Sequence, residues 1–152
     1  VSGVVMGMLL ILISFFIQTG EVTIDAVLLS IPSILLVAAI MMSNNIRDIV
    51  GDEKSGRKTL AILVGRKNAV HILLSFFLIS YVWVVALVAI GYLTPWALFI
   101  FISAPKPIKA IKIFKAHEEP LKVMPAMKET AVTNTVFTLL LGIGILCSHL
   151  FS

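Results

Sequence analysis

The feature that most constrains this chain is the confinement of its basic residues to two short segments. All twelve lysines and arginines lie within residues 47–67 and 106–128. The long stretches without any charged side chain are residues 1–20, 26–46, 68–105 and 130–152. Because about 20 apolar residues let a helix cross a hydrocarbon layer of ~30 Å, these stretches predict membrane-spanning helices.

The composition excludes an ordinary soluble enzyme. Hydrophobic residues make up 59% of the 152 residues and charged residues only 13%, whereas a soluble domain carries about 25% charged residues. Such a chain cannot cover a water-facing surface with polar groups, so lipid must replace water over much of it. A disulfide scaffold is also excluded, because Cys147 is the single cysteine. In such a chain we interpret the net charge of +4 as a signal that orients the protein in the membrane, and not as a sign of nucleic-acid binding.

The number of spans follows from the longest uncharged stretch, residues 68–105. It is too long for one span and is divided by residues 91–95, a turn whose last residue, Pro95, suits the start of a helix. We therefore predict an all-α fold, a polytopic transmembrane helix bundle. Its five spans are expected near residues 1–18, 26–44, 68–91, 95–113 and 130–151.

Two smaller patterns concern the shape and packing of these helices. Pro105 and Pro107 predict a kink in the fourth span. Beyond the kink, lysines recur every three residues and are expected to reach toward lipid headgroups: Lys106, Lys109, Lys112 and Lys115. Close approach of helices is expected at two pairs of glycines: Gly3 with Gly7, and Gly142 with Gly144.

The basic segments also predict an orientation. With five alternating spans, both basic segments fall on one side of the membrane. The segments on the other side contain Glu21 and Asp25 but no lysine or arginine. Because basic loops are retained in the cytoplasm, we expect a multi-pass protein of a cell (inner) membrane, with the basic loops cytoplasmic.

The segment that carries chemistry begins where the second span ends. If that helix continues, Asn44, Asp48 and Asp52 lie one turn apart on one face. Two carboxylates with an amide oxygen form the kind of site that Mg²⁺ prefers and often shares with substrate phosphates. The basic residues of the same loop are suited to phosphate oxygens: Arg47, Lys54, Arg57 and Lys58. The alternative is a solvated mixed-charge loop that only sets topology.

These residues resemble a known family. The run Asn44-Asn45-Ile46-Arg47-Asp48-x-x-x-Asp52, followed by Gly56-Arg57-Lys58-Thr59-Leu60-Ala61, resembles the second aspartate-rich motif of the UbiA superfamily of intramembrane prenyltransferases. The continuation Ile-Leu-Val-Gly and the later residues 103–106 resemble its menaquinone branch in particular. Members of that branch transfer a polyprenyl group from an isoprenoid diphosphate to 1,4-dihydroxy-2-naphthoate.

The resemblance implies an architecture and roles for single residues. Members have nine helices around a central cavity, so residues 1–152 are expected to be the C-terminal part of one transmembrane prenyltransferase domain. By the family's chemistry, Asp48 and Asp52 hold Mg²⁺ against the isoprenoid diphosphate. The residues expected to bind the diphosphate are Asn44, Asn45, Arg47 and Lys58. The resemblance assigns no further catalytic residue within this chain.

The first aspartate-rich motif of the family does not occur in this sequence, in which Asp25 is the only other aspartate. The chain also begins at Val1, directly in an apolar run. We therefore expect a missing N-terminal half of the same enzyme to supply the first motif. This chain alone is accordingly expected to be inactive.

Two alternatives remain open at this point. One keeps the family but changes the acceptor to another quinone precursor or a lipid alcohol. The other is a non-catalytic transporter or membrane subunit whose basic loops only set topology. A transporter would be expected to carry ionisable residues or broken helices near mid-membrane. Only the region of Pro105 offers such a break, so the prenyltransferase interpretation is preferred.

Overall fold

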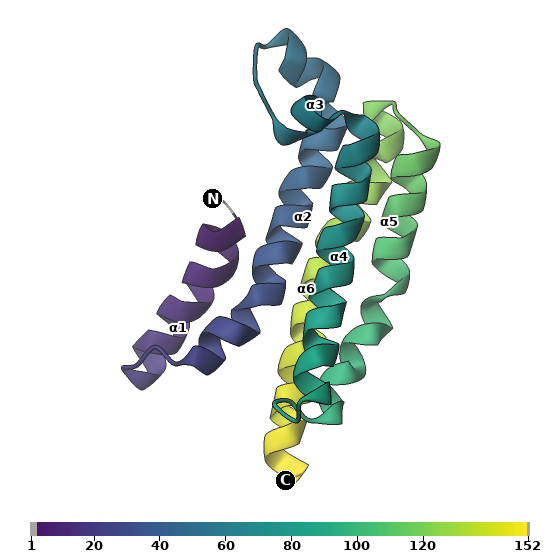
Figure 1. Ribbon diagram of the computed structural model, residues 1–152. Coiled ribbons are helices and arrows are strands. Elements are labelled where there is room, and N and C mark those ends of the chain that lie inside the picture. Colours follow the sequence, from purple (N-terminus) through teal and green to yellow (C-terminus); the bar gives the residue numbers. More distant parts are fainter. Residues whose placement is uncertain (1–2, 152) are drawn as a thin grey trace.

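The computed structural model describes residues 3–151, and every regular element within them is a helix (Figure 1). The expected all-α fold class is therefore confirmed. The elements in chain order are η1 (Val4–Leu9), α1 (Leu10–Thr19), α2 (Ile24–Lys54), α3 (Leu60–Val64), α4 (Arg66–Ala89), η2 (Pro95–Ser103), α5 (Pro105–Ala116) and α6 (Pro120–Phe151). The first two residues of the predicted span 1–18 lie outside the described residues.

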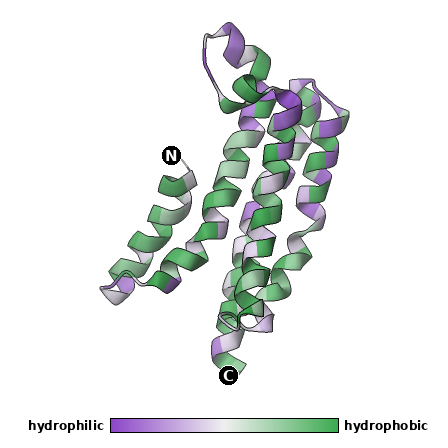
Figure 2. Cartoon of the chain, viewed as in Figure 1, coloured by the Kyte–Doolittle hydropathy of each residue, from purple (hydrophilic) through white to green (hydrophobic). Residues whose placement is uncertain are grey.

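Three helices are long and apolar enough to cross a membrane, namely α2, α4 and α6. The π-helical η1 and α1 together form a shorter apolar helix, Val4–Thr19. The segment expected as the fourth span consists of η2, a 3-10 helix, followed by α5. Figure 2 shows hydrophobic residues along the helices and hydrophilic residues gathered toward the end where α3 lies. This distribution is consistent with a polytopic membrane bundle.

The helices pack as a bundle with α1 at its side. Helix α2 contacts both α4 and α6, and α6 also lies against η2 and α5. The η1–α1 arm contacts no helix other than α2 within the described chain (Figure 1). The largest fully buried side chains come from five of the helical elements: Leu36, Ile46, Leu73, Val84, Ile100, Phe114 and Phe137. The core therefore lies between α2, α4, η2, α5 and α6.

Glycines permit the closest helix contacts. A Cβ atom on Gly7 would stand 2.7 Å from the backbone of Ile34, and one on Gly144 would stand 2.6 Å from the carbonyl oxygen of Trp96. One on Gly3 would stand 2.8 Å from the Ile34 carbonyl oxygen. The expectation of close approach is confirmed at these three glycines. It is wrong for Gly142, where a Cβ would meet only open space.

The predicted kink lies between η2 and α5. The 3-10 helix ends at Ser103, and α5 begins at Pro105, a position that needs no backbone N–H. The Ser103 hydroxyl donates to the Ile100 carbonyl oxygen at 2.6 Å and lies 2.5 Å from the Tyr81 hydroxyl of α4. The break is therefore tied to α4 by a buried hydrogen bond.

The structure corrects the expectation for two of the four lysines beyond the kink. Lys109 Nζ lies 2.6 Å from Glu129 Oε1, and Lys106 Nζ lies 3.6 Å from Glu129 Oε2. Only 11% of the Glu129 side chain is exposed, so its charge needs cationic partners. These two lysines therefore join α5 to α6, whereas Lys112 and Lys115 are exposed. Helix α6 begins at Pro120, ahead of the predicted span 130–151.

Candidate functional site

The motif residues lie on the last turns of α2, which is continuous from Ile24 to Lys54. Asn44, Asp48 and Asp52 therefore follow one another at one-turn intervals. The helix ends because Gly56 adopts a positive φ of 71°, which favours glycine. The Ser55 N–H donates to the carbonyl oxygens of Gly51 and Asp52, both at 3.1 Å, and closes the last turn.

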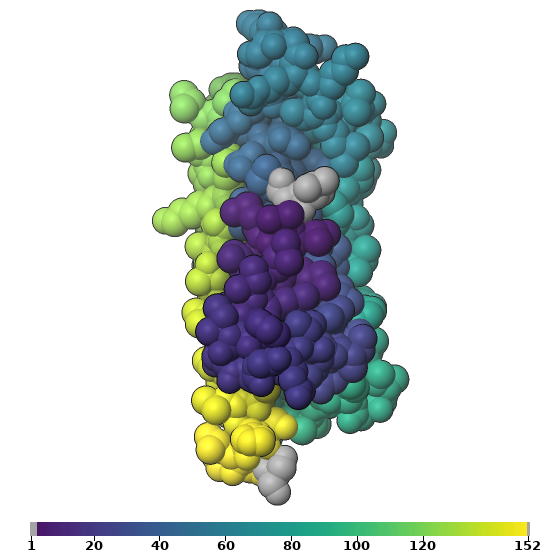
Figure 3. All heavy atoms as spheres, turned by 90° about the vertical axis from the view of Figure 1, so that its left-hand side faces the viewer, coloured from purple at the N-terminus to yellow at the C-terminus, as the bar shows by residue number. Residues whose placement is uncertain are grey.

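The direction of the motif follows from helix geometry. Eighteen residues make about five turns of an α-helix, so Asp52 lies on the same face of α2 as Ile34. Ile34 is the residue that η1 contacts through Gly3 and Gly7. The buried residues Leu36 and Ile46 lie on another face, directed at the bundle core. The aspartates therefore point away from the core, on the side of α2 where η1 packs. Figure 3 shows the end of α2 above η1 from this side.

Asp48 is held by the neighbouring arginine. Arg47 Nε lies 2.6 Å from Asp48 Oδ1 and Nη2 lies 2.5 Å from Oδ2, so the pair is bidentate. The exposed fractions are 28% for the Arg47 side chain and 40% for that of Asp48. Asp48 lies beyond the predicted span 26–44, and its hydrogen bonds with Arg47 hold the pKa of its carboxyl group below the usual value. The carboxylate is thus ionised at neutral pH.

Asp52 is covered by the loop that follows α2. Its Oδ1 lies 3.4 Å from Nη1 of Arg57, and its side chain is only 13% exposed. The Arg57 N–H also donates to the Asp52 carbonyl oxygen at 2.9 Å, which folds the loop back over the helix end. Arg57 itself is 74% exposed, so its guanidinium group is accessible from solvent.

Within residues 3–151, the other predicted diphosphate ligands have no hydrogen-bond or ion-pair partners. Asn44 and Asn45 are half-buried, and their side-chain amides make no hydrogen bond within residues 3–151. Lys58 is exposed and, in that same range, forms no ion pair. Across the part of the chain that the structure describes, no three His, Cys, Asp or Glu side chains gather as a metal site. The oxygen donors of Asp48 and Asp52 still suit a hard cation such as Mg²⁺.

Sequence reasoning missed the role of Arg66, which joins three segments near this site. Its Nη1 donates to the Ile46 carbonyl oxygen of α2 at 3.0 Å. Its Nη2 donates to the carbonyl oxygens of Phe114, at 3.2 Å, and His117. Gly65, which has a φ of 77°, separates α3 from α4 immediately before Arg66, but it does not indicate these contacts. Arg66 thereby fixes the motif end of α2 to α4 and to the end of α5.

Comparison with known proteins agrees with this geometry. Residues 1–120 match the model of the UbiA prenyltransferase family. The chain belongs to this family of prenyltransferases.

Individual relatives extend the match over nearly the whole chain. It is 52% identical over 148 residues to 1,4-dihydroxy-2-naphthoate octaprenyltransferase of Bacillus subtilis, covering 97% of this chain and 48% of that protein. It is 30% identical over 146 residues to the UbiA prenyltransferase domain-containing protein 1 homolog of Drosophila melanogaster, covering 96% of this chain and 39% of that protein. It is 29% identical to 1,4-dihydroxy-2-naphthoate octaprenyltransferase of Haemophilus influenzae, covering 88% of this chain and 43% of that protein.

The chain therefore spans about half the length, or less, of the curated relatives it matches. No solved structure matches it significantly.

Proposed function

We propose that this chain is part of a membrane prenyltransferase that moves a polyprenyl group from an isoprenoid diphosphate to an aromatic acceptor. The acceptor proposed is 1,4-dihydroxy-2-naphthoate, in menaquinone biosynthesis, because the 52% identical relative from Bacillus subtilis carries that name. The observation that carries the proposal is the pair Asp48 and Asp52, one turn apart on a face of α2 directed away from the packed core.

The cofactor proposed is Mg²⁺, held by the carboxylates of Asp48 and Asp52. When bound, Mg²⁺ neutralises the charge that develops on a departing diphosphate. The unpartnered amides of Asn44 and Asn45 are available beside the carboxylates as neutral oxygen ligands or as donors to phosphate.

The basic side chains have the complementary role of binding the diphosphate. The planar guanidinium group of Arg47, which is bidentate on the Asp48 carboxylate, is also a suitable donor to a phosphate bound beside that carboxylate. Lys58 is exposed and free to add a third positive charge next to Arg57. Donors fixed before the reaction stabilise the leaving diphosphate without reorganisation of water.

In the proposed reaction, the allylic carbon exchanges its bond to the diphosphate for a bond to the acceptor ring. The allylic C–O bond breaks, its electron pair leaves with the diphosphate, and the allylic carbon forms a C–C bond with the acceptor ring. The attacked ring carbon then loses its carboxylate as CO₂, and the C–C electron pair restores the aromatic ring. An apolar enclosure protects the allylic cation from water.

We also propose an orientation for the chain in the membrane and a source for the aspartate-rich motif that it lacks. The basic segments 47–67 and 106–128 are proposed to face the cytoplasm from a cell (inner) membrane, by the positive-inside rule. The first aspartate-rich motif of the family is proposed to come from the missing N-terminal half, because the Bacillus subtilis relative is about twice as long as the segment it shares with this chain. Residues 1–152 alone are therefore expected to be inactive.

The test is an acceptor assay with the full-length protein in bacterial membranes. Radiolabelled farnesyl diphosphate is supplied with 1,4-dihydroxy-2-naphthoate, with 4-hydroxybenzoate, or with a lipid alcohol. Prenylated naphthol with release of CO₂ is expected, together with loss of product in EDTA and recovery on addition of Mg²⁺. If product formed only with another acceptor, the proposed acceptor would be wrong but the prenyltransferase class would stand. No product with any acceptor would favour the non-catalytic alternative.

A further inference from the structure

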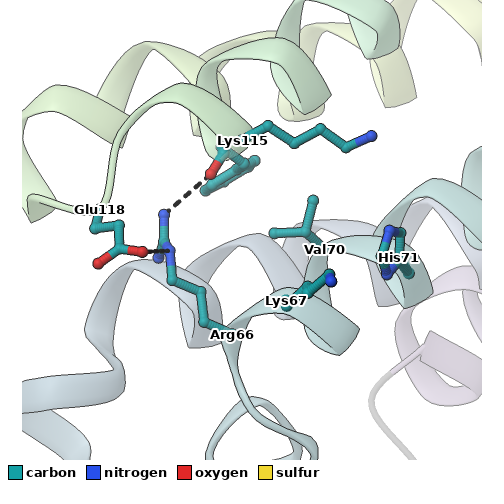
Figure 4. A pocket seen from close by; sticks show the side chains of 7 residues that line it. Arg66, Lys67, Val70, His71, Lys115 and Glu118 are labelled. Carbon is teal, nitrogen blue, oxygen red and sulfur yellow. Dashed lines mark hydrogen bonds and ion pairs between the residues drawn. The ribbon is translucent and has the colours of Figure 1, made fainter.

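A basic pocket of about 420 Å³ lies between the start of α4 and the end of α5. Arg66, Lys67 and His71 line it from α4, Lys115 lines it from α5, and Glu118 closes one end. Figure 4 shows Lys115 on the side opposite Lys67 and His71, with Arg66 turned toward Glu118. Cationic side chains from two helices therefore line the pocket, together with the apolar side chains of Val70 and Phe114.

The two lysines of this pocket have no acidic partner among the described residues. Arg66 is already bound to three carbonyl oxygens, and its Nε lies 4.0 Å from Glu118 Oε1, whose side chain is 87% exposed. Neither Lys67 nor Lys115 forms an ion pair with any residue in the range 3–151. Positive charge therefore exceeds negative charge in the pocket, and an anion would compensate it.

A second, apolar pocket of about 190 Å³ lies along the same two helical arms, on the side of the first pocket toward η2. On α4 it begins at Leu74, one turn after His71. Its opposite wall includes Ala104 and Pro107, which lie at the break between η2 and α5. The small side chain and the change of helix type leave a concave surface there.

The length over which the two pockets follow α4 matches the thickness of one leaflet of a bilayer. From Lys67 to Tyr81, the last α4 residue of the apolar pocket, α4 rises about 21 Å. Half of a bilayer, including headgroups, is also about 20–22 Å thick. The basic end lies toward the hydrophilic end of the molecule (Figure 2), and the apolar end lies within the predicted spans.

We propose that the groove between α4 and the η2–α5 arm binds a phospholipid with an anionic headgroup. Its phosphate lies between Lys67 and Lys115, with His71 as a further donor, and one acyl chain lies along Leu78 and Ile108. Basic pockets between transmembrane helices on the cytoplasmic side bind anionic headgroups for the same reason. The groove lies on the side of the bundle away from α1, so this site does not depend on the function proposed for the aspartates (Figure 1).

The experiment measures lipid retention by native mass spectrometry of the full-length protein released from detergent. The probes are phosphatidylglycerol, phosphatidylcholine with matched acyl chains, and inorganic phosphate without lipid. The test variant is Lys67→Gln/Lys115→Gln. The matched control is Lys112→Gln/Lys128→Gln, which removes two exposed lysines outside the pocket. A third variant, Leu78→Ala/Ile108→Ala, shortens exposed side chains of the apolar wall.

The proposal predicts preferential retention of phosphatidylglycerol by the unmodified protein and by the control. Each lysine near an anionic lipid contributes about fivefold, so the test variant should bind phosphatidylglycerol roughly 30-fold more weakly. The apolar-wall variant should retain less of both lipids. Equal retention of the two lipids, or an unchanged preference in the test variant, would overturn the proposal. Inorganic phosphate bound as tightly as the lipid would overturn it too, because the apolar groove would then contribute nothing.

Discussion

Arg47 donates two hydrogen bonds to the carboxylate of the adjacent Asp48, from Nε at 2.6 Å and from Nη2 at 2.5 Å. The same arginine reaches Met124 of α6, with Nη1 3.7 Å from Sδ. Both oxygens of a proposed metal ligand are therefore engaged by a cation of the protein. The pair keeps Asp48 ionised and gives the guanidinium group a fixed position next to the proposed diphosphate site.

The first prediction concerns competition at this pair. Arg47→Ala should bind Mn²⁺, used as a probe for Mg²⁺, about tenfold more tightly without diphosphate, because Asp48 is released. The same variant should bind isoprenoid diphosphate more weakly, because a phosphate ligand is lost. Electron paramagnetic resonance of free Mn²⁺ measures the first effect, and KM measures the second. Lys112→Ala, which removes an exposed lysine of α5 outside the motif, serves as the control. Unchanged Mn²⁺ affinity in Arg47→Ala would contradict this account of the pair.

The second prediction compares two glycines of α6. A Cβ at position 144 would stand 2.6 Å from the Trp96 carbonyl oxygen, whereas one at position 142 would meet nothing within 4 Å. Gly144→Ala should therefore lower stability by about 1–3 kcal/mol, as overpacking does. Gly142→Ala should leave stability unchanged or raise it slightly. Thermal unfolding in detergent distinguishes them, and equal melting temperatures would show that α6 does not pack this closely on η2.

The third prediction concerns Arg66. Arg66→Ala should lower stability by at least about 2–3 kcal/mol, because carbonyl oxygens of α2, α5 and the loop after α5 lose a charged donor. Arg66→Lys should recover only part of this, since one ammonium group cannot match the fork of a guanidinium. Hydrogen exchange should also increase around Phe114 and His117. The matched control is Lys112→Ala, a change at an exposed lysine. If Arg66→Ala were as stable as this control, Arg66 would not join α2, α4 and α5 as described.

The fourth prediction concerns the ion pairs between α5 and α6. Glu129→Gln should destabilise the bundle by about 1–3 kcal/mol, because a mostly buried acceptor no longer carries the charge that Lys106 and Lys109 pair with. In a double-mutant cycle, Lys109→Gln should cost much less in the Glu129→Gln background than alone. Strict additivity of the two substitutions would mean that the pair makes no contribution.

Much of the fold could be predicted because its signals are local. The uncharged stretches are continuous in sequence, so the long helices α2, α4 and α6 follow from length and composition. The alignment of Asp48 with Asp52 follows from helical periodicity alone. The break at Ala104 could be predicted in the same way, because Pro105 and Pro107 act on their own neighbours.

The details that could not be predicted depend on contacts between distant segments. Nothing near Arg66 indicates that it binds carbonyl oxygens 20, 48 and 51 residues away. The distinction between Gly142 and Gly144 depends on which face of α6 meets η2. Lys109 was expected to reach lipid headgroups. Its actual partner, Glu129, belongs to another helix, so the local sequence does not indicate this ion pair.

The central claim is that Asp48 and Asp52 bind the metal and diphosphate of a prenyltransferase. The most direct measurement is the rate of prenyl transfer to 1,4-dihydroxy-2-naphthoate by full-length Asp48→Asn, Asp52→Asn and Glu53→Gln proteins of verified folding. Glu53 is an exposed neighbour of the motif and the matched control. Each Asp→Asn protein should lose on the order of 100-fold or more in kcat, and Glu53→Gln should keep nearly full activity. Full activity in both Asp→Asn proteins would contradict the claim.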